Sequence, residues 1–197
     1  MTGVTRTLDD TGRALLEAAG KLLVEFGAEA LTVRRISAAA GCSTMGLYSR
    51  FGGKEGLVDH LFREGFVGLG EAMDAVTADL TPSSALRVCG RAYRSYALAH
   101  ASHYLVMFTG VVPGFQPSSE SKAIAHSTFE RLVENVTRAQ AEDAMRPDVA
   151  PDVIAEIVWA TIHGFVMLEL VGMDTVSCPS SELYELVLDQ IERGWAP

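Results

Sequence analysis

Apolar residues recur every three to four positions along most of the chain, which is the spacing of one face of an α-helix. Proline, glycine and serine interrupt this pattern, and no segment has the alternation typical of a strand. The first predicted helix covers residues 8–26, with Thr7 or Thr11 as its N-cap. Its predicted inner stripe consists of Leu15, Ala19, Leu22 and Phe26. The whole pattern predicts an all-α protein with about nine helices.

Two short helices follow close together in the first third of the chain. Thr32 is a candidate N-cap for the first, Gly41 ends it, and Ser43 is a candidate N-cap for the second. The residues expected to anchor this pair on the first helix are Ile36, Leu47 and Phe51. Two short helices joined by such a turn are typical of a helix-turn-helix, whose second helix enters the major groove of DNA.

The remaining face of the second short helix carries side chains suited to DNA. Thr44 and Tyr48 lie one helical turn apart with Met45 beside them, so we expect them to face base edges. Gly46 has no side chain and would let the helix backbone approach DNA closely. Tyr48 is alternatively a core aromatic whose hydroxyl finds an internal partner. The side chains predicted to contact phosphate are those of Thr32, Arg34, Ser43, Arg50 and Lys54.

Charge is distributed unevenly within a total of −9. Residues 1–54 hold seven Lys/Arg and five Asp/Glu, whereas residues 55–197 hold nine Lys/Arg and twenty Asp/Glu. Phosphate binding requires local rather than average positive charge. The charge pattern permits a small DNA-binding domain over residues 1–54 that is joined to an acidic helical domain over residues 55–197.

The helix-turn-helix segment also resembles a known family. The block reads "LTVRRISAAAGCSTMGLYSRFGGKEGL" and is similar to the helix-turn-helix of the TetR family of bacterial regulators. The shared pattern is a Thr that opens the second helix, an A-G-[VC]-S turn, L-Y on the recognition helix and F-x-x-K-[ED]-x-L beyond it. The resemblance covers about residues 10–60. The chain departs from the pattern at Cys42, where valine is usual, and at 44–46.

A second resemblance lies in the segment "VWATIHGFVMLELVGM", which is similar to the Trp…His-Gly signature of a WHG-type C-terminal domain in that family. The two resemblances together imply a homodimeric transcription regulator, usually a repressor. They also imply a C-terminal domain that binds a small-molecule effector and dimerises through the last two helices. Its DNA partner would be a palindromic double-stranded operator.

Methionine and aromatic side chains are candidates for an adaptable apolar ligand pocket. Few charges accompany them, which indicates an uncharged apolar effector. His163 is either a satisfied core histidine or a ligand contact within the Trp…His-Gly signature, and each of the others also suits ordinary core packing. The candidate ligand-binding residues are Tyr104, Met107, Phe108, Phe129, Trp159, His163 and Met167.

The last two predicted helices need more cover than a single chain readily provides. The helix over 152–173 is apolar nearly all round, and the helix over 180–194 carries two apolar stripes. A second copy related by two-fold symmetry would cover both helices. A monomer with a deeply buried final hairpin is the alternative. The predicted dimer-interface residues are Val158, Ile162, Phe165, Tyr184, Leu188, Ile191 and Trp195.

Catalytic signatures are sparse. The sequence has no glycine-rich phosphate loop, nucleophile elbow or recognisable set of metal ligands, so we expect neither enzymatic activity nor a cofactor or metal. His100 and His103 are three residues apart and would suit a metal if helical, which leaves a small metal-dependent enzyme as one alternative. A helical protein-interaction module that uses the acidic body is the other.

Cysteine usage and hydropathy indicate the compartment. The three cysteines are widely spaced and form no C-x-x-C pattern, which suits free thiols in a reducing cytoplasm. The N-terminal segment has no apolar stretch typical of a secretory signal, and no segment reaches the length of uncharged apolar residues that a membrane span needs. We expect a cytoplasmic protein without a membrane partner.

Overall fold

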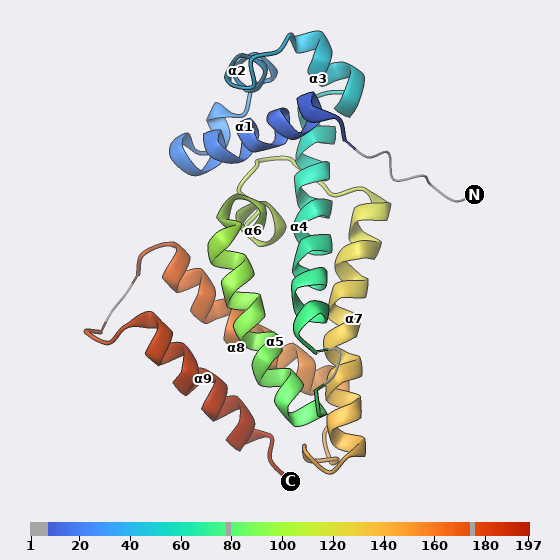
Figure 1. The fold of residues 1–197 in the computed structure, drawn as a ribbon, viewed down its shortest axis with the longest axis vertical. Helices are drawn as coiled ribbons and strands as arrows, with labels where there is room; N and C mark the ends of the chain where they lie inside the picture. The colour runs from blue at the N-terminus through green and yellow to red at the C-terminus, as the bar shows by residue number, and fades with distance from the viewer. Residues whose placement is uncertain (1–7, 78–79, 174–175) are drawn as a thin grey trace. The chain divides into compact units, whose positions relative to one another are not determined.

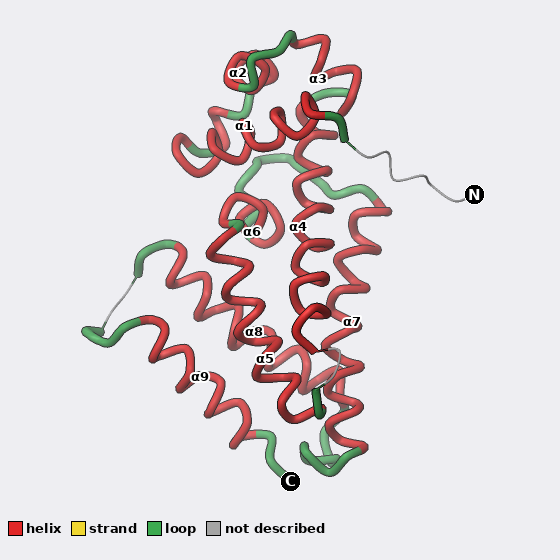
Figure 2. Tube along the Cα trace, in the orientation of Figure 1, coloured by secondary structure: helices red, strands yellow, loops and turns green. Residues whose placement is uncertain are grey.

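The computed structural model describes residues 8–77, 80–173 and 176–197. Within these ranges the chain forms nine α-helices and one short 3-10 helix, with no strand (Figures 1 and 2), which confirms the all-α prediction. The elements are α1 (Asp10–Phe26), η1 (Ala28–Ala30), α2 (Val33–Ala39), α3 (Thr44–Phe51), α4 (Lys54–Thr77), α5 (Pro82–Ala99), α6 (Ala101–Phe108), α7 (Ser119–Ala141), α8 (Pro151–Leu170) and α9 (Ser180–Gly194).

The helices group into two compact units. The first contains the chain up to residue 65 together with residues 101–122, and the second contains residues 66–100 and 123–197. The first unit therefore holds α1, α2, α3 and α6, and the second holds α5, α8 and α9; α4 and α7 contribute to both. The functional boundary expected after residue 54 stays a prediction, because the compact units are defined by packing alone.

The first unit is built on α1, whose start and end differ in detail from the sequence-based expectation. Asp9 caps the helix, because its side chain accepts a hydrogen bond of 2.8 Å from the Gly12 amide; Thr11 does not, and Thr7 lies outside the described residues. Phe26 was predicted to face inward, but its side chain is 60% exposed. The last turn of α1 instead buries Leu23, and the Arg35 guanidinium covers the Phe26 ring at 5.4 Å from its centroid.

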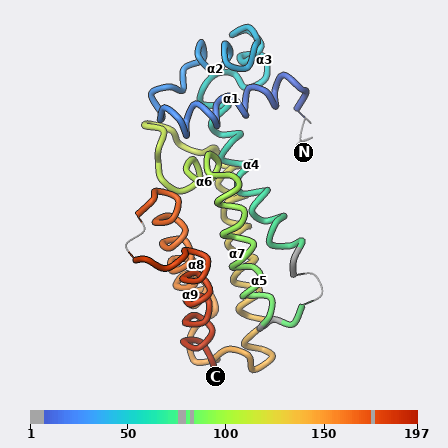
Figure 3. The backbone as a smooth tube through the Cα atoms, turned by 60° about the vertical axis from the view of Figure 1, so that its left-hand side comes forward, coloured from blue at the N-terminus to red at the C-terminus, as the bar shows by residue number. Residues whose placement is uncertain are grey.

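The second unit is organised around α5, which packs against α8, and α8 packs in turn against α9 (Figure 3). The Tyr184 hydroxyl on α9 donates a 2.6 Å hydrogen bond to the carbonyl oxygen of Gly90 on α5. Arg87 on α5 donates to Glu185 at 2.9 Å and to Glu192 at 2.8 Å, both on α9. Polar bonds from one face of α9 thus tie it to α5.

The helix α8 is the most apolar element of this unit. Five side chains on one of its faces are buried: Ile154, Ala155, Val158, Ile162 and Val166. By length and composition alone, α8 is the one helix among the described residues that meets the criterion for a membrane span, a criterion that core helices of soluble proteins also meet. Helix α8 ends at Leu170, whereas the sequence pattern predicts a helix that continues to residue 173.

Candidate nucleic-acid interface

Side-chain caps fix the two short helices α2 and α3. The Thr32 hydroxyl accepts a hydrogen bond from the Arg35 amide, and the Ser43 hydroxyl accepts one from the Gly46 amide, each at 3.2 Å. Both residues are therefore the N-caps that the sequence predicts. Gly41 lies between the helices with φ +67°, a left-handed conformation that favours glycine. This is the turn of a helix-turn-helix.

The recognition helix α3 has an inner and an outer face. Leu47 is fully buried, and the neighbouring Tyr48 is 52% exposed. Met45 is 72% exposed, and Thr44 is exposed beside it. The alternative in which Tyr48 is a core aromatic does not fit this exposure. Thr44, Met45 and Tyr48 thus share the solvent-facing side of α3, as a base-reading role requires.

Arg50, the one charged residue of α3, is engaged with α1 in the isolated chain. Its Nε donates to Asp9 Oδ1 at 2.7 Å, its Nη2 pairs with Asp9 Oδ2, and its Nη1 donates to the Gly46 carbonyl at 3.0 Å. The hydrogen bonds with Asp9 raise the pKa of Arg50 above its already high value. The side chain that the sequence suggests as a phosphate contact is therefore already held by a carboxylate.

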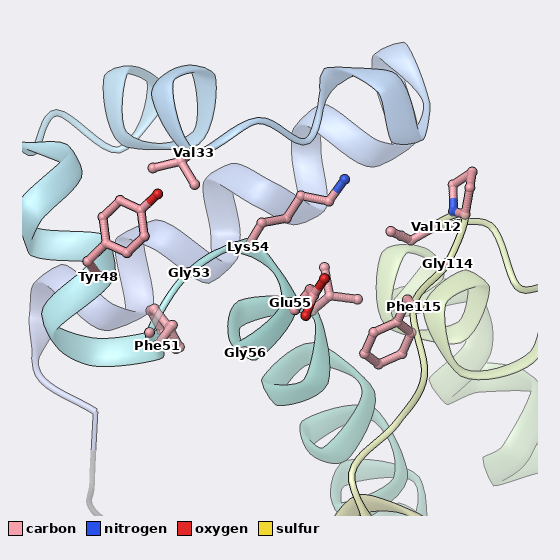
Figure 4. Close-up of a pocket in the computed structure, with 13 residues that line it drawn as sticks. Val33, Tyr48, Phe51, Gly53, Lys54, Glu55, Gly56, Val112, Gly114 and Phe115 are labelled. Carbon is pink, nitrogen blue, oxygen red and sulfur yellow. The ribbon is translucent and has the colours of Figure 1, made fainter.

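The other predicted phosphate contacts lie around α3 at helix starts. Thr32 and Ser43 are exposed N-caps, Arg34 is exposed in the first turn of α2, and Lys54 begins α4. Lys54 and Tyr48 line an open groove of about 560 Å³ in the first unit (Figure 4). Its other lining residues are Val33, Phe51, Gly52, Gly53, Glu55, Gly56, Val58, Val112, Pro113, Gly114 and Phe115.

The predicted ligand-binding residues fall into two separate groups. The first unit holds Tyr104, Met107 and Phe108, with the Tyr104 and Phe108 ring centroids 4.8 Å apart. The second unit holds the other four: Phe129, Trp159, His163 and Met167. There the Trp159 centroid lies 6.0 Å from that of Phe129 and 5.6 Å from that of His163. The structure brings these three rings of the second unit together as one aromatic group.

Tyr93 on α5 completes this group and was not among the predicted site residues. Its side chain is only 3% exposed, its hydroxyl accepts a 3.3 Å hydrogen bond from Trp159 Nε1, and it lies 3.2 Å from His163 Nδ1. Burial lowers the pKa of His163 and so favours the neutral form of its imidazole. The helical stripe of α5 marks Tyr93 as inward-facing, but nothing in the local pattern pairs it with α8, whose sequence lies about seventy residues further on.

The predicted dimer-interface residues lie mainly on inner faces. Val158, Ile162, Tyr184 and Leu188 are buried within the second unit itself. Phe165, Ile191 and Trp195 are partly buried, with the Phe165 and Tyr184 rings 5.3 Å apart. The exposed side of α8 carries another set, which repeats at helical spacing: Val153, Ile157, Ala160, Thr161, Gly164 and Leu168.

The two histidines considered as metal ligands each have a different neighbour. His100 follows α5 and stacks on Tyr96, with 4.5 Å between ring centroids, whereas His103 Nε2 in the first unit lies 3.5 Å from Glu64 Oε2. Among the residues that the structure describes, no group of three or more His, Cys, Asp or Glu side chains converges on one point.

A capped helix-turn-helix with an exposed recognition face, attached to a helical second unit, defines a DNA-binding regulator. Sequence comparison agrees with this class. Residues 15–61 match the family model of bacterial regulatory proteins of the tetR family, and residues 86–191 match that of a tetracyclin repressor-like C-terminal domain. The chain belongs to the TetR family of transcriptional regulators.

Solved structures show the same fold over nearly the whole chain. A protein with unknown function from Rhodococcus sp. RHA1 is 27% identical, with 99% of this chain and 100% of that chain covered at a TM-score of 0.82. The TetR family regulator PfmR from Thermus thermophilus is 22% identical, with 91% and 97% covered at a TM-score of 0.75. A bacterial regulatory protein of the tetR family from Rhodococcus RHA1 is 18% identical, with 93% and 98% covered at 0.75. No curated protein sequence matches the chain.

Proposed function

We propose that the protein is a ligand-responsive repressor that binds a palindromic operator as a homodimer and leaves it when a small apolar molecule binds. The observation that carries the DNA-binding part is the division of α3 into a buried Leu47 and an exposed face with Met45 and Tyr48. A helix anchored on one side and exposed on the other fits the major groove of a duplex.

Phosphate contacts would orient α3 on the duplex. Thr32, Arg34, Ser43 and Lys54 lie at or near the first turns of α2, α3 and α4. Backbone amides at helix starts and exposed cations are suited to phosphate oxygens. Such contacts set register and supply affinity that depends on salt, whereas the exposed face of α3 would supply sequence preference.

The homodimer proposal rests on the exposed side of α8. Ile157 and Leu168 are each about half exposed on this side, with Ala160 and Gly164 between them. A Cβ added at Gly164 would meet no atom within 4 Å, so a second helix has room to approach there. Contact between this stripe and the same stripe of a second copy would bury apolar surface under two-fold symmetry. The resulting dimer would present two helix-turn-helix segments to an inverted repeat.

The effector proposal rests on the aromatic group of the second unit. Phe129 and Trp159 bring apolar surface to this group, and the hydrogen-bonded Tyr93 and His163 bring polar atoms beside it. This combination suits a small uncharged apolar molecule. If the molecule binds more tightly to a dimer geometry that does not fit the operator, it shifts the population away from the DNA-binding geometry. With three free cysteines, the protein is proposed to act in the cytoplasm.

Selection of bound duplexes from a random pool tests the proposal. The expected result is an inverted repeat that binds two protomers. Ile157→Asp and Leu168→Asp should convert the dimer to a monomer in sedimentation and weaken binding to the full repeat. Val24→Asp, at a similarly exposed position on α1, is the matched control and should leave the dimer intact. Recovery of no preferred duplex would contradict the DNA-binding part, and a wild-type monomer would contradict the dimer.

A further inference from the structure

The recognition helix α3 has little charge with which to read bases. Arg50 is its one charged residue. The Nε and Nη2 atoms of Arg50 both donate to the carboxylate of Asp9, and Nη1 donates to the Gly46 carbonyl. An arginine that reads guanine must present two free N–H groups to O6 and N7 of the base. To do so, Arg50 would have to leave a two-point ion pair.

The exposed face of α3 offers a different chemistry. Met45 has the most exposed large apolar side chain of the helix, and Thr44 beside it carries a methyl group and a hydroxyl. The Ser49 hydroxyl donates to the Gly46 carbonyl at 3.1 Å, so it is bonded within the helix. An apolar surface at this place has one complementary feature in the major groove, the C5-methyl group of thymine.

We infer that α3 recognises its half-site through thymine methyl groups, with Met45 as the specificity-determining residue, an inference that rests on the proposed operator binding. Met45 is flexible and polarisable, so it adapts to the methyl group and excludes water from it. Cytosine has only a hydrogen at C5 in place of this methyl group. An apolar side chain also leaves the N4 amine of cytosine and the O6 and N7 atoms of guanine without hydrogen-bond partners. Discrimination thus combines contact with a methyl group and exclusion of polar base edges.

Replacement of thymine by uracil tests this inference directly, because uracil lacks the methyl group and retains the hydrogen-bonding edge. The probe is a duplex recovered from the random pool, synthesised again with uracil in place of each half-site thymine in turn. Binding by the wild-type protein should weaken about fourfold for each methyl group lost from contact. Uracil at positions that α3 does not reach should leave the affinity of the protein for the duplex unchanged.

The Met45→Ala variant separates methyl contact from an effect of uracil on duplex shape. Met45 is exposed, so the variant should fold normally, which a thermal unfolding curve checks. In this variant the ratio of thymine-duplex to uracil-duplex affinity should fall to about one. A shape effect would leave that ratio unchanged. Val24→Ala, at an exposed apolar position of α1, is the matched control and should keep the wild-type ratio.

Two outcomes overturn the inference: wild-type protein that binds thymine and uracil duplexes equally, or a ratio that persists in Met45→Ala. Failure of the proposed function looks different, because then the pool yields no preferred duplex for the wild-type protein. That result would remove operator binding and the thymine inference together.

Discussion

Arg50 and Asp9 form a two-point ion pair that joins the recognition helix α3 to the start of α1. Asp9 Oδ1 also accepts the Gly12 amide at 2.8 Å, so one carboxylate both caps α1 and holds α3. The two residues lie 41 positions apart in the sequence. This arrangement makes Arg50 a positioning residue for α3 in the unbound protein.

Salt dependence distinguishes positioning from phosphate contact. Arg50→Ala should weaken operator binding several-fold because α3 loses its ion pair with α1, but the slope of log affinity against log salt should stay as in the wild type. Lys54→Ala should reduce the steepness of that slope by about 0.9, the value for one phosphate contact. Fluorescence anisotropy at several salt concentrations measures both. A shallower slope for Arg50→Ala would restore Arg50 to the phosphate contacts.

Gly56, in the first turn of α4, has no room for a side chain. A Cβ there would lie 1.9 Å from the carbonyl oxygen of Phe51, which is backbone at the end of α3. Gly56→Ala should therefore displace that end and destabilise the protein by about 1–3 kcal/mol, measured by urea unfolding. Gly46→Ala is the matched control, since its Cβ would meet its nearest atoms at 3.7 Å. A Gly56→Ala variant as stable as wild type would contradict the steric argument.

Tyr93→Phe removes the hydroxyl between Trp159 Nε1 and His163 Nδ1 and keeps the ring. The two nitrogens lose a buried partner, so the free energy of unfolding should fall by about 1–3 kcal/mol. The emission of Trp159 should also shift, because its indole N–H changes partner. Tyr48→Phe removes a hydroxyl at an exposed position and should leave stability as it is. Unchanged stability and emission in Tyr93→Phe would exclude the network as a structural element.

The lowered pKa values of two histidines predict that the protein loses stability in mild acid. Burial lowers the pKa of His163, and burial together with the nearby Arg63 lowers that of His60. Because the unfolded chain protonates near its ordinary value of about 6.5, it binds more protons than the folded chain below that pH. The free energy of unfolding should therefore fall as the pH drops below about 6.5, and the double variant His60→Gln, His163→Gln should flatten this fall. Equal curves for both proteins would reject these histidines as the cause.

The parts of the fold set by near neighbours could be predicted from the sequence. The N-caps Thr32 and Ser43 depend on amides three residues away, and the opposite exposure of Leu47 and Tyr48 follows from helical periodicity. Asp9, and not a predicted threonine, caps α1. Its carboxylate accepts hydrogen bonds both from the Gly12 amide and from the distant Arg50 side chain. The helix content follows from local pattern alone.

The parts that depend on distant partners could not be predicted. Periodicity shows that α8 is apolar, but it does not show which of its faces meets its own unit. For this reason Val158 and Ile162 were expected at a dimer interface and are buried within the chain. The bond from Trp159 to Tyr93 joins residues 66 positions apart, and no local signal relates them.

The attachment of α9 has a consequence for how the protein can change over time. Tyr184 and Arg87 secure this helix from the side that meets α5, whereas Leu186 on the helix is exposed. Substitutions at the exposed positions leave those bonds intact. The outer side of α9 can therefore change in sequence while the helix stays bonded to α5.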